Sequence, residues 1–174
     1  MTIKLMKDVR PDYMAFCFDI GKPTLRLEID PNYKANRDET PPDLKVQIPY
    51  IRKISEALGI PCFGQEGYEA DDLIGTFTRF GREQGVEVVI VSGDKDFAQL
   101  IAPHVTLYDT MKEVRYDATL AFEKWGVEPR KMIDYLSIVG DTSDNVPGVA
   151  GIGTKGAQKL LADFDSLEDI YANL

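Results

Sequence analysis

The sequence has 174 residues, 44% of them hydrophobic, which suits one domain with a core and includes no run near the ~18 apolar residues of a membrane span. A single histidine, His104, and two separated cysteines, Cys17 and Cys62, disfavour a zinc site, a Ser-His-Asp triad and a disulfide framework, and favour a cytoplasmic protein with reduced thiols. The net charge of −9 argues against a nucleic-acid partner only if the acidic residues are spread over the surface, so the motifs must decide that question.

In the first half of the chain, short apolar runs alternate with helical patterns. Residues 13–18 (YMAFCF) predict a buried strand that ends at Asp19. Residues 21–42 contain a glycine, spaced prolines and many charges, and predict an irregular excursion. Apolar spacing then predicts a helix over residues 43–58, a short strand over 60–63 and a second helix over 69–83 with Leu73, Ile74 and Phe77 on its inner face.

The second half contains the clearest strand, residues 86–91 (VEVVIV), bounded by glycines. The remaining predicted elements are a brief helix over 97–101, strands over 105–108 and 114–116 around a turn at Met111 and Lys112, and helices over 118–124, 130–138, 154–164 and 167–172. Alternating strands and helices indicate an α/β fold with a parallel sheet, followed by a helical subdomain. We predict a domain over residues 1–116 and a helical subdomain over 117–174.

Acidic residues cluster at the predicted ends of separate elements: Asp19, Glu69, Asp71, Asp72, Asp94, Asp96, Asp141 and Asp144. Any one set could be a helix start or a turn. Ligands bind at the carboxyl ends of strands in such sheets. The occurrence of several acidic sets at such ends therefore favours one shared metal-binding site. Carboxylates gathered this closely need divalent cations, and oxygen ligands favour Mg²⁺ or Mn²⁺. Two such ions could activate water and neutralise charge on a transferring phosphoryl group.

Two segments are suited to nucleic acid. Tyr33 lies beside Lys34 and Arg37 in YKANR, and a stacking ring next to cations suits a single strand, although a solvated charged loop has the same composition. The segment GVAGIGTK leads into an apolar helix and could hold a phosphate backbone at the helix N-terminus, or could be a glycine-rich turn without a ligand. Its candidate contact residues are Gly148, Gly151, Gly153, Thr154 and Lys155, with Lys159 one turn further on.

The chain resembles the 5′→3′ exonuclease domain at the N-terminus of bacterial DNA polymerase I, within the 5′ nuclease (flap endonuclease) superfamily. The resembling segments span nearly the whole chain in the family's order: PDYMAFCFD, YKANRDETPPDLKVQIPYI, GYEADDLIGT, VSGDKDFAQL, VGDTSDNVPGVAGIG and TKGAQKLLADFDSLEDI. The resemblance implies a PIN-like sheet with flanking helices, and a structure-specific nuclease that acts by two-metal-ion catalysis in DNA replication and repair. Its substrates would be 5′ flaps, 5′ ends and RNA primers.

The resemblance also implies roles for single residues. The eight acidic residues match the family's metal-site acids, which would bind two Mg²⁺ or Mn²⁺ ions. Lys34 and Arg37 match basic residues of a helical arch over residues 21–42, where we expect them to act in catalysis and to bind the 5′ strand. Arg26 and Tyr33 lie beside them and would meet the substrate. Residues 148–155 resemble the helix–three-turn–helix that holds duplex backbone together with a K⁺ ion.

One departure from the family pattern concerns the ends. The family begins with a strand whose Asp-Gly pair supplies a further metal ligand, and nothing similar precedes Pro11. Residues 1–10 resemble only the end of the family's first helix, and relatives continue past residue 174 with more helices and a covalently linked polymerase. We therefore expect a piece of a larger protein. Alternative functions are a fragment that binds branched or duplex DNA without cleaving it, a ribonuclease acting on RNA alone, and, with less support, a small-molecule phosphatase.

Overall fold

A computed structural model describes residues 2–174 of the chain. Its contacts form two compact units, Met1–Pro31 with Arg37–Ile74, and Asn32–Asn36 with Gly75–Leu174. The predicted boundary between residues 116 and 117 lies inside the second unit and remains a prediction. No helix formed by residues 2–174 has the length and apolar character that crossing a membrane requires.

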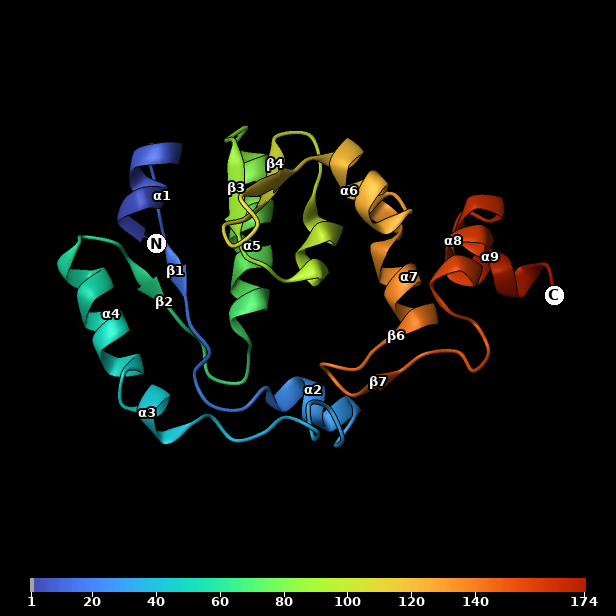
Figure 1. Cartoon of the computed structure of the whole chain (residues 1–174), viewed down its shortest axis with the longest axis horizontal. Helices are drawn as coiled ribbons and strands as arrows, with labels where there is room; N and C mark the ends of the chain where they lie inside the picture. Colours follow the sequence, from blue (N-terminus) through green and yellow to red (C-terminus); the bar gives the residue numbers. More distant parts are fainter. Residues whose placement is uncertain (1) are drawn as a thin grey trace. The chain divides into compact units, whose positions relative to one another are not determined.

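The first unit is built on two short parallel strands, β1 (Phe16–Cys17) and β2 (Cys62–Phe63) (Figure 1). The predicted strand over residues 13–18 is therefore confirmed in place but is only two residues long. The helices of this unit are α1 (Thr2–Val9), α2 (Thr24–Ile29), α3 (Pro42–Lys45) and α4 (Ile48–Ala57). Of these, α4 packs beside β2.

Two details of the first unit differ from the sequence prediction. Residues 21–42 include the helix α2 and are not wholly irregular. The predicted helix over 43–58 is divided into α3 and α4, because Pro49 occupies the first turn of α4 and proline suits a helix start but not a helix interior. The apolar residues of α4 also remain in contact with solvent, with Ile51 47% and Ile54 60% exposed.

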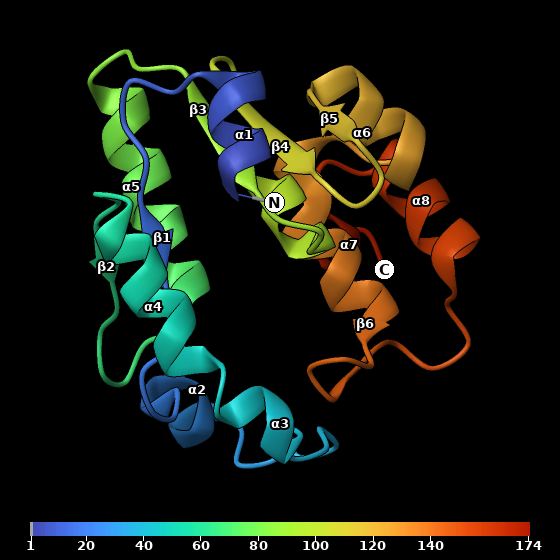
Figure 2. The ribbon, with the colours of Figure 1, turned by 60° about the vertical axis from the view of Figure 1, so that its left-hand side comes forward.

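The second unit contains a three-stranded sheet in the order β3 (Val88–Val91), β4 (Val105–Asp109) and β5 (Val114–Tyr116) (Figure 2). All three strands were predicted, as was the turn at Met111 and Lys112. β3 and β4 are parallel, whereas β5 returns antiparallel to β4. The sheet is thus mixed, because a short turn can join only antiparallel neighbours.

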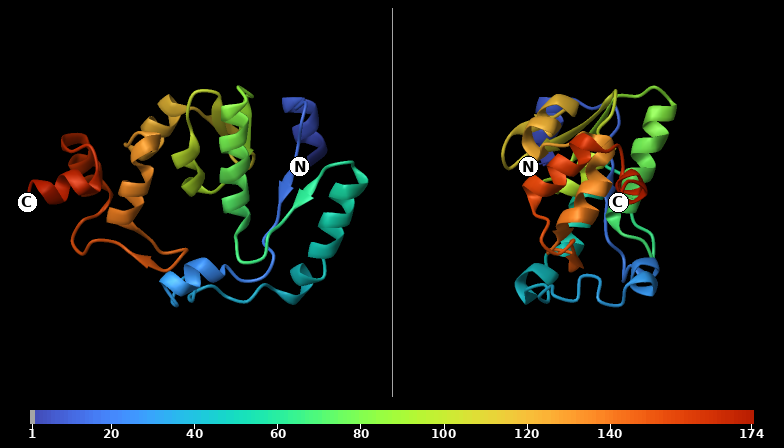
Figure 3. Two further views of the ribbon diagram at one scale, coloured as in Figure 1. Left: turned by 180° about the vertical axis from the view of Figure 1, so that it is seen from behind. Right: turned by 90° about the vertical axis from the view of Figure 1, so that its right-hand side faces the viewer.

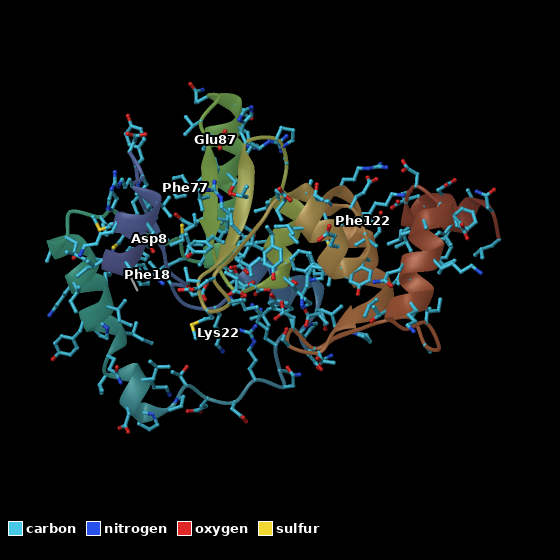
Figure 4. The ribbon with its side chains drawn as sticks, turned by 45° about the horizontal axis from the view of Figure 1, so that its top comes forward. Asp8, Phe18, Lys22, Phe77, Glu87 and Phe122 are labelled. Carbon is cyan, nitrogen blue, oxygen red and sulfur yellow. The ribbon has the colours of Figure 1, made fainter. Side chains whose placement is uncertain are left out.

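The helical elements are α5 (Ala70–Glu83), η1 (Lys95–Leu100), α6 (Ala118–Trp125), η2 (Pro129–Lys131), α7 (Met132–Val139), α8 (Thr154–Asp163) and α9 (Leu167–Ala172). Their bounds follow the sequence prediction closely, with capping residues that the sequence displays. The Asp117 side chain accepts a hydrogen bond from Leu120 N at the start of α6. The predicted inner face of α5 is only partly correct, since Phe77 is 38% exposed (Figure 4).

Helices α7 and α8 pack together near the C-terminus of the second unit (Figure 3). Met132 and Ile138 of α7 are almost completely buried. The ammonium group of Lys131 donates hydrogen bonds to two carbonyl oxygens at the end of α8, Leu161 O at 2.7 Å and Phe164 O at 2.9 Å. Those carbonyls have no partner within the helix, so a half-buried lysine satisfies them and ties α8 to the start of α7.

We expect Lys131→Met to lower the free energy of unfolding by about 1–3 kcal/mol, because methionine keeps the apolar stem but leaves two carbonyl groups without their donor. Chemical denaturation monitored by circular dichroism measures this change. Lys124→Met on exposed α6 removes the same charge and serves as the control, with a change below ~0.5 kcal/mol. Equal stability of the two variants would contradict the proposed role of Lys131.

Candidate functional site

Acidic residues of the first unit gather where β1 ends and α5 begins. Asp19 comes two residues after β1, and its Oδ1 accepts a hydrogen bond of 2.6 Å from Ala70 N at the first position of α5. Asp72 Oδ2 accepts one of 2.9 Å from Glu69 N. Carboxylates in this position interact favourably with the free N–H groups and positive end of a helix. The end of β1 and the start of α5 thus bring together Asp19, Glu69 and Asp72, whose role as metal ligands remains a prediction.

Arg26 of α2 forms ion pairs with two of these acids. Its guanidinium donates two hydrogen bonds to the Asp72 carboxylate, at 2.7 and 2.9 Å, and its Nε lies 3.1 Å from Glu69 Oε2. Glu69 is buried, with 7% of its surface exposed, so the charge of Arg26 offsets a carboxylate that has lost most of its water. Arg26 was predicted to contact DNA, and in this structure it contacts carboxylates. Asp71 lies half-buried in the same first turn of α5.

The acids of the second unit follow β3 and the helix α7. Asp94 Oδ1 accepts a hydrogen bond from Asp96 N and so caps η1. Lys95, between them, extends its ammonium group to Asp141 Oδ2 and lies 3.4 Å from Asp96 Oδ1. Ser143 donates to the other oxygen of Asp141 from both its N–H and its hydroxyl group. Two of the predicted metal-site acids, Asp96 and Asp141, therefore contact one lysine, and Asp94 precedes that lysine in the chain.

The pKa values of this group reflect the balance between burial and the lysine. Burial raises the pKa of Asp96, and repulsion by Asp94 and Asp141 adds to this effect more than Lys95 offsets it. Burial would also raise the pKa of Asp141, but hydrogen bonds from Lys95 and Ser143 outweigh burial and lower that pKa to about 2. The pKa of Lys95 is raised, since its two carboxylate partners outweigh its own loss of solvent. Asp141 and Lys95 are therefore both charged near neutral pH and attract each other.

The donor chemistry of both clusters suits a hard cation, because every candidate ligand is a carboxylate. Asp96 Oδ1 is also buried without accepting a hydrogen bond from any of residues 2–174, which leaves a lone pair for a cation. Across that same described range, no three His, Cys, Asp or Glu side chains form a group ready to hold a metal ion. In each unit, a basic side chain lies among the carboxylates.

The segment Asn32–Asn36, predicted to meet a single strand, is fixed to the loop that contains Asp144. Tyr33 donates its hydroxyl hydrogen to Asp144 Oδ2 at 2.9 Å, and Lys34 Nζ lies 3.8 Å from Asp144 Oδ1. Asn36 donates to Thr142 O, and Lys34 has a left-handed backbone with φ of 55°. The YKAN segment thus has a defined conformation on this loop. Arg37, the other predicted arch cation, is exposed between α2 and α3.

Sequence reasoning missed two residues near the acids. Asp109 ends β4 and is 3% exposed, and its carboxylate lies beside Gly93, next to the predicted ligand Asp94. It accepts hydrogen bonds from Met111 N and Lys112 N, and the hydrogen bond from the Lys112 side chain lowers its pKa. Its position after the apolar run VTLY could have revealed it. The sequence gives no signal for the role of Lys95, because its partner Asp141 lies 46 residues further along the chain.

The glycine-rich segment follows a two-stranded antiparallel hairpin, β6 (Gly140–Asp141) and β7 (Val146–Pro147). A Cβ atom at Gly148 would collide with the carbonyl oxygens of Val139 and Ile138. Val149 N donates to Ile138 O at 2.7 Å, so the chain passes directly against the end of α7. Gly151, with φ of 83°, adopts the left-handed backbone that glycine favours.

The N-terminus of α8 is the segment predicted to bind a phosphate backbone, and that role remains a prediction. Gly153 precedes the helix without capping it through a side chain, and Thr154 and Lys155 begin it. Lys155 and Lys159 are both exposed and, four residues apart, lie on one face of α8. The first turn of a helix also has N–H groups without a partner in the helix, so α8 begins with N–H donors and carries two exposed cations.

Two family profiles match the chain end to end. Residues 1–126 match the 5′-3′ exonuclease N-terminal resolvase-like domain, and residues 127–174 match the 5′-3′ exonuclease C-terminal SAM fold. The chain belongs to the 5′-3′ exonuclease family. The SAM-fold match corresponds to the helical region predicted to contain the helix–three-turn–helix.

Relatives of this 5′-3′ exonuclease chain include DNA polymerases I. It is 41% identical to DNA polymerase I of Bacillus caldotenax over 178 aligned residues, covering 100% of this chain and 20% of the polymerase. It is 44% identical to DNA polymerase I of Caldicellulosiruptor bescii, covering 100% of this chain and 21% of the polymerase. The chain therefore spans about a fifth of the length of these relatives.

Solved structures agree with the family fold. T5 5′-exonuclease with bound divalent metal ions (zinc) matches with a TM-score of 0.87 and 27% identity, covering 99% of this chain and 68% of that one. A complex of the bacteriophage T5 flap endonuclease with DNA and metal ions matches with a TM-score of 0.86 and 26% identity, covering 99% and 67%. The α/β fold with a helical C-terminal region is thus confirmed for this family member.

We expect Gly148→Ala to destabilise the chain by about 1–3 kcal/mol, because the added methyl group must displace backbone carbonyl oxygens at the end of α7. The matched control is Gly75→Ala in α5, where, apart from the adjoining residues and the helix's own nearby backbone, no described atom lies within 4 Å of the added carbon. That variant should gain about 0.5–1 kcal/mol from helix propensity. Thermal unfolding compares the two, and a neutral Gly148→Ala would show that the close approach is not required.

Proposed function

We propose that this chain is a metal-dependent 5′→3′ exodeoxyribonuclease and flap endonuclease that hydrolyses phosphodiesters at the 5′ ends and flaps of DNA. The observation that carries the proposal is the pair of carboxylate clusters, each following a β-strand in a chain of the 5′-3′ exonuclease family. The T5 relative is named for the same activity and binds divalent metal ions. RNA primers base-paired to DNA are a further proposed substrate.

The proposed metal ligands are Asp19, Glu69, Asp71, Asp72, Asp94, Asp96, Asp141 and Asp144. When bound, two Mg²⁺ or Mn²⁺ ions would activate a water molecule and neutralise charge on the scissile phosphate. The chain's own contribution is to hold the carboxylates in place: Ala70 N orients Asp19, the η1 backbone orients Asp94, and Ser143 orients Asp141. This arrangement fixes ligand positions before a metal arrives, which limits the entropy lost on binding.

The basic side chains in the segment 21–42 would bind the 5′ strand of the DNA. Lys34 and Arg37 are proposed to interact with phosphates near the scissile bond, and Tyr33 to stack against a base. Because Tyr33 and Lys34 contact Asp144 in this structure, substrate binding would exchange those contacts for contacts with DNA. Arg26 would likewise leave Asp72 and Glu69 to meet a phosphate.

The duplex would bind at the start of α8. Gly148, Gly151 and Gly153 allow the chain to approach a phosphate backbone, and Lys155 and Lys159 add charge on one helix face. From the family resemblance we further propose that a K⁺ ion binds at this segment. We also propose that the chain acts in the cytoplasm in DNA replication and repair, and that the full-length protein includes a linked polymerase.

We expect Asp94→Asn to reduce cleavage of a 5′-labelled flap duplex in Mg²⁺ or Mn²⁺ by at least ~100-fold. Asparagine retains the oxygen that caps η1 but removes a charge from the proposed metal site. Denaturing gel electrophoresis of the products measures the rate. Asp163→Asn on the exposed end of α8 is the matched control, with an unchanged rate.

Equal cleavage by wild type and Asp94→Asn would contradict a metal site that includes Asp94. Absence of cleavage by the wild type, with salt-sensitive duplex binding retained, would favour the alternative of a DNA-binding fragment without activity. Preference for single-stranded RNA over the DNA flap would instead favour the ribonuclease alternative.

We expect the double variant Lys155→Ala, Lys159→Ala to bind duplex DNA more weakly and with less dependence on salt. Loss of two phosphate contacts should reduce the slope of log K against log salt concentration by about 2. Fluorescence anisotropy at a series of salt concentrations measures the slope. Lys7→Ala, Lys124→Ala removes two exposed helix lysines elsewhere and should leave affinity and slope unchanged.

A further inference from the structure

The ammonium group of Lys95 occupies a position among acidic residues that a metal ion would be expected to take. It donates a hydrogen bond to Asp141 Oδ2 and lies 3.4 Å from Asp96 Oδ1. The two acids are 45 residues apart in sequence and come from η1 and β6. Without a cation, two carboxylates held this closely would repel each other. One lysine therefore joins two separate elements.

The contacts of the two aspartates show that the lysine fills this role incompletely. Both oxygens of Asp141 have donors, from Lys95 and Ser143. Asp96 Oδ1 is buried, accepts no hydrogen bond from residues 2–174 and has only the ion-pair contact with Lys95. A single positive charge thus satisfies one acid fully and the other in part, whereas a divalent ion could bind both.

The first unit contains a parallel case. Arg26 there holds Asp72 through two hydrogen bonds and Glu69 through its Nε. In both units, a basic side chain neutralises two proposed metal ligands, at least one of which comes from a distant segment. The two residues differ in one respect: Arg26 is also proposed to bind DNA, whereas Lys95 is not.

We propose that Lys95 is a built-in counter-cation that holds Asp96 and Asp141 together in the metal-free protein and must leave them before a divalent ion binds. The role is that of a positioning residue, and it rests on the proposed function because it concerns the same metal site. Lys95 therefore has two opposite effects: it stabilises the metal-free fold, and it competes with the metal. The side chain is 39% exposed, so a route to solvent exists for the displaced ammonium group.

Mn²⁺ binding without DNA tests this role, with isothermal titration calorimetry as the readout. Four proteins are compared: wild type, Lys95→Gln, Lys95→Arg and Lys124→Gln. We expect Lys95→Gln to bind Mn²⁺ about three- to tenfold more tightly than wild type, since it lacks the competing charge. Lys95→Arg keeps the charge and should bind within about twofold of wild type. Lys124→Gln makes the same charge change on exposed α6 and should also match wild type.

Thermal unfolding provides a second readout. Metal-free Lys95→Gln should unfold at a lower temperature than wild type, because Asp96 and Asp141 lose their counter-cation, and saturating Mn²⁺ should remove the difference. Unchanged or weaker Mn²⁺ binding by Lys95→Gln would overturn the role of Lys95, as would unchanged metal-free stability. Equal Mn²⁺ binding by all four proteins would overturn it while leaving the proposed nuclease site intact. Mn²⁺ binding by none of the four would overturn both.

Discussion

Carboxylates of like charge must be held close together in this chain, and each cluster is stabilised by a cation from its own unit. In the first unit, Arg26 pairs with Asp72 and Glu69. In the second, Lys95 pairs with Asp141 and Asp96, and Lys34 approaches Asp144. At an effective dielectric constant of about 20, unit charges 4 Å apart interact by ~4 kcal/mol, so unpaired acids at these positions would drive the elements apart. The ion pairs therefore determine how strand ends, helix starts and loops meet.

Backbone N–H groups also hold the carboxylates in position. The N–H groups of Ala70, Asp96 and Ser143 each donate to an acid, so local chain geometry aims the carboxylates before any ligand is present. In a binding site, this kind of preorganisation reduces the entropy lost when the ligand arrives. It also explains why Asp94 and Asp141 occur at a helix start and beside a turn, where free N–H groups are available.

The helical region combines close backbone packing with hydrogen bonds from a lysine to helix-end carbonyl groups. Gly148 passes against the carbonyl oxygens at the end of α7, and Lys131 binds the carbonyl oxygens at the end of α8. The first contact joins the glycine-rich segment to α7, and the second joins the end of α8 to the start of α7. The start of α8, with Lys155 and Lys159 on its exposed face, is thereby held on a fixed support. The proposed duplex contact at the start of α8 would therefore rest on a backbone that local packing holds in place.

The sequence by itself determined most elements of the second unit, because their signals are local: the β-branched run of β3, the cap at Asp117 and the glycines around α8 are properties of neighbouring residues. The sequence also predicted which acidic residues are candidate metal ligands. It predicted the first unit less well, since Pro49 divided a helix and only two residues of an apolar run entered β1. Only the tertiary structure decided which cation neutralises which acid. Arg26 and Asp72 are 46 residues apart, and Tyr33 and Asp144 are 111 apart. Such partners depend on how distant segments meet, and no local propensity encodes that meeting.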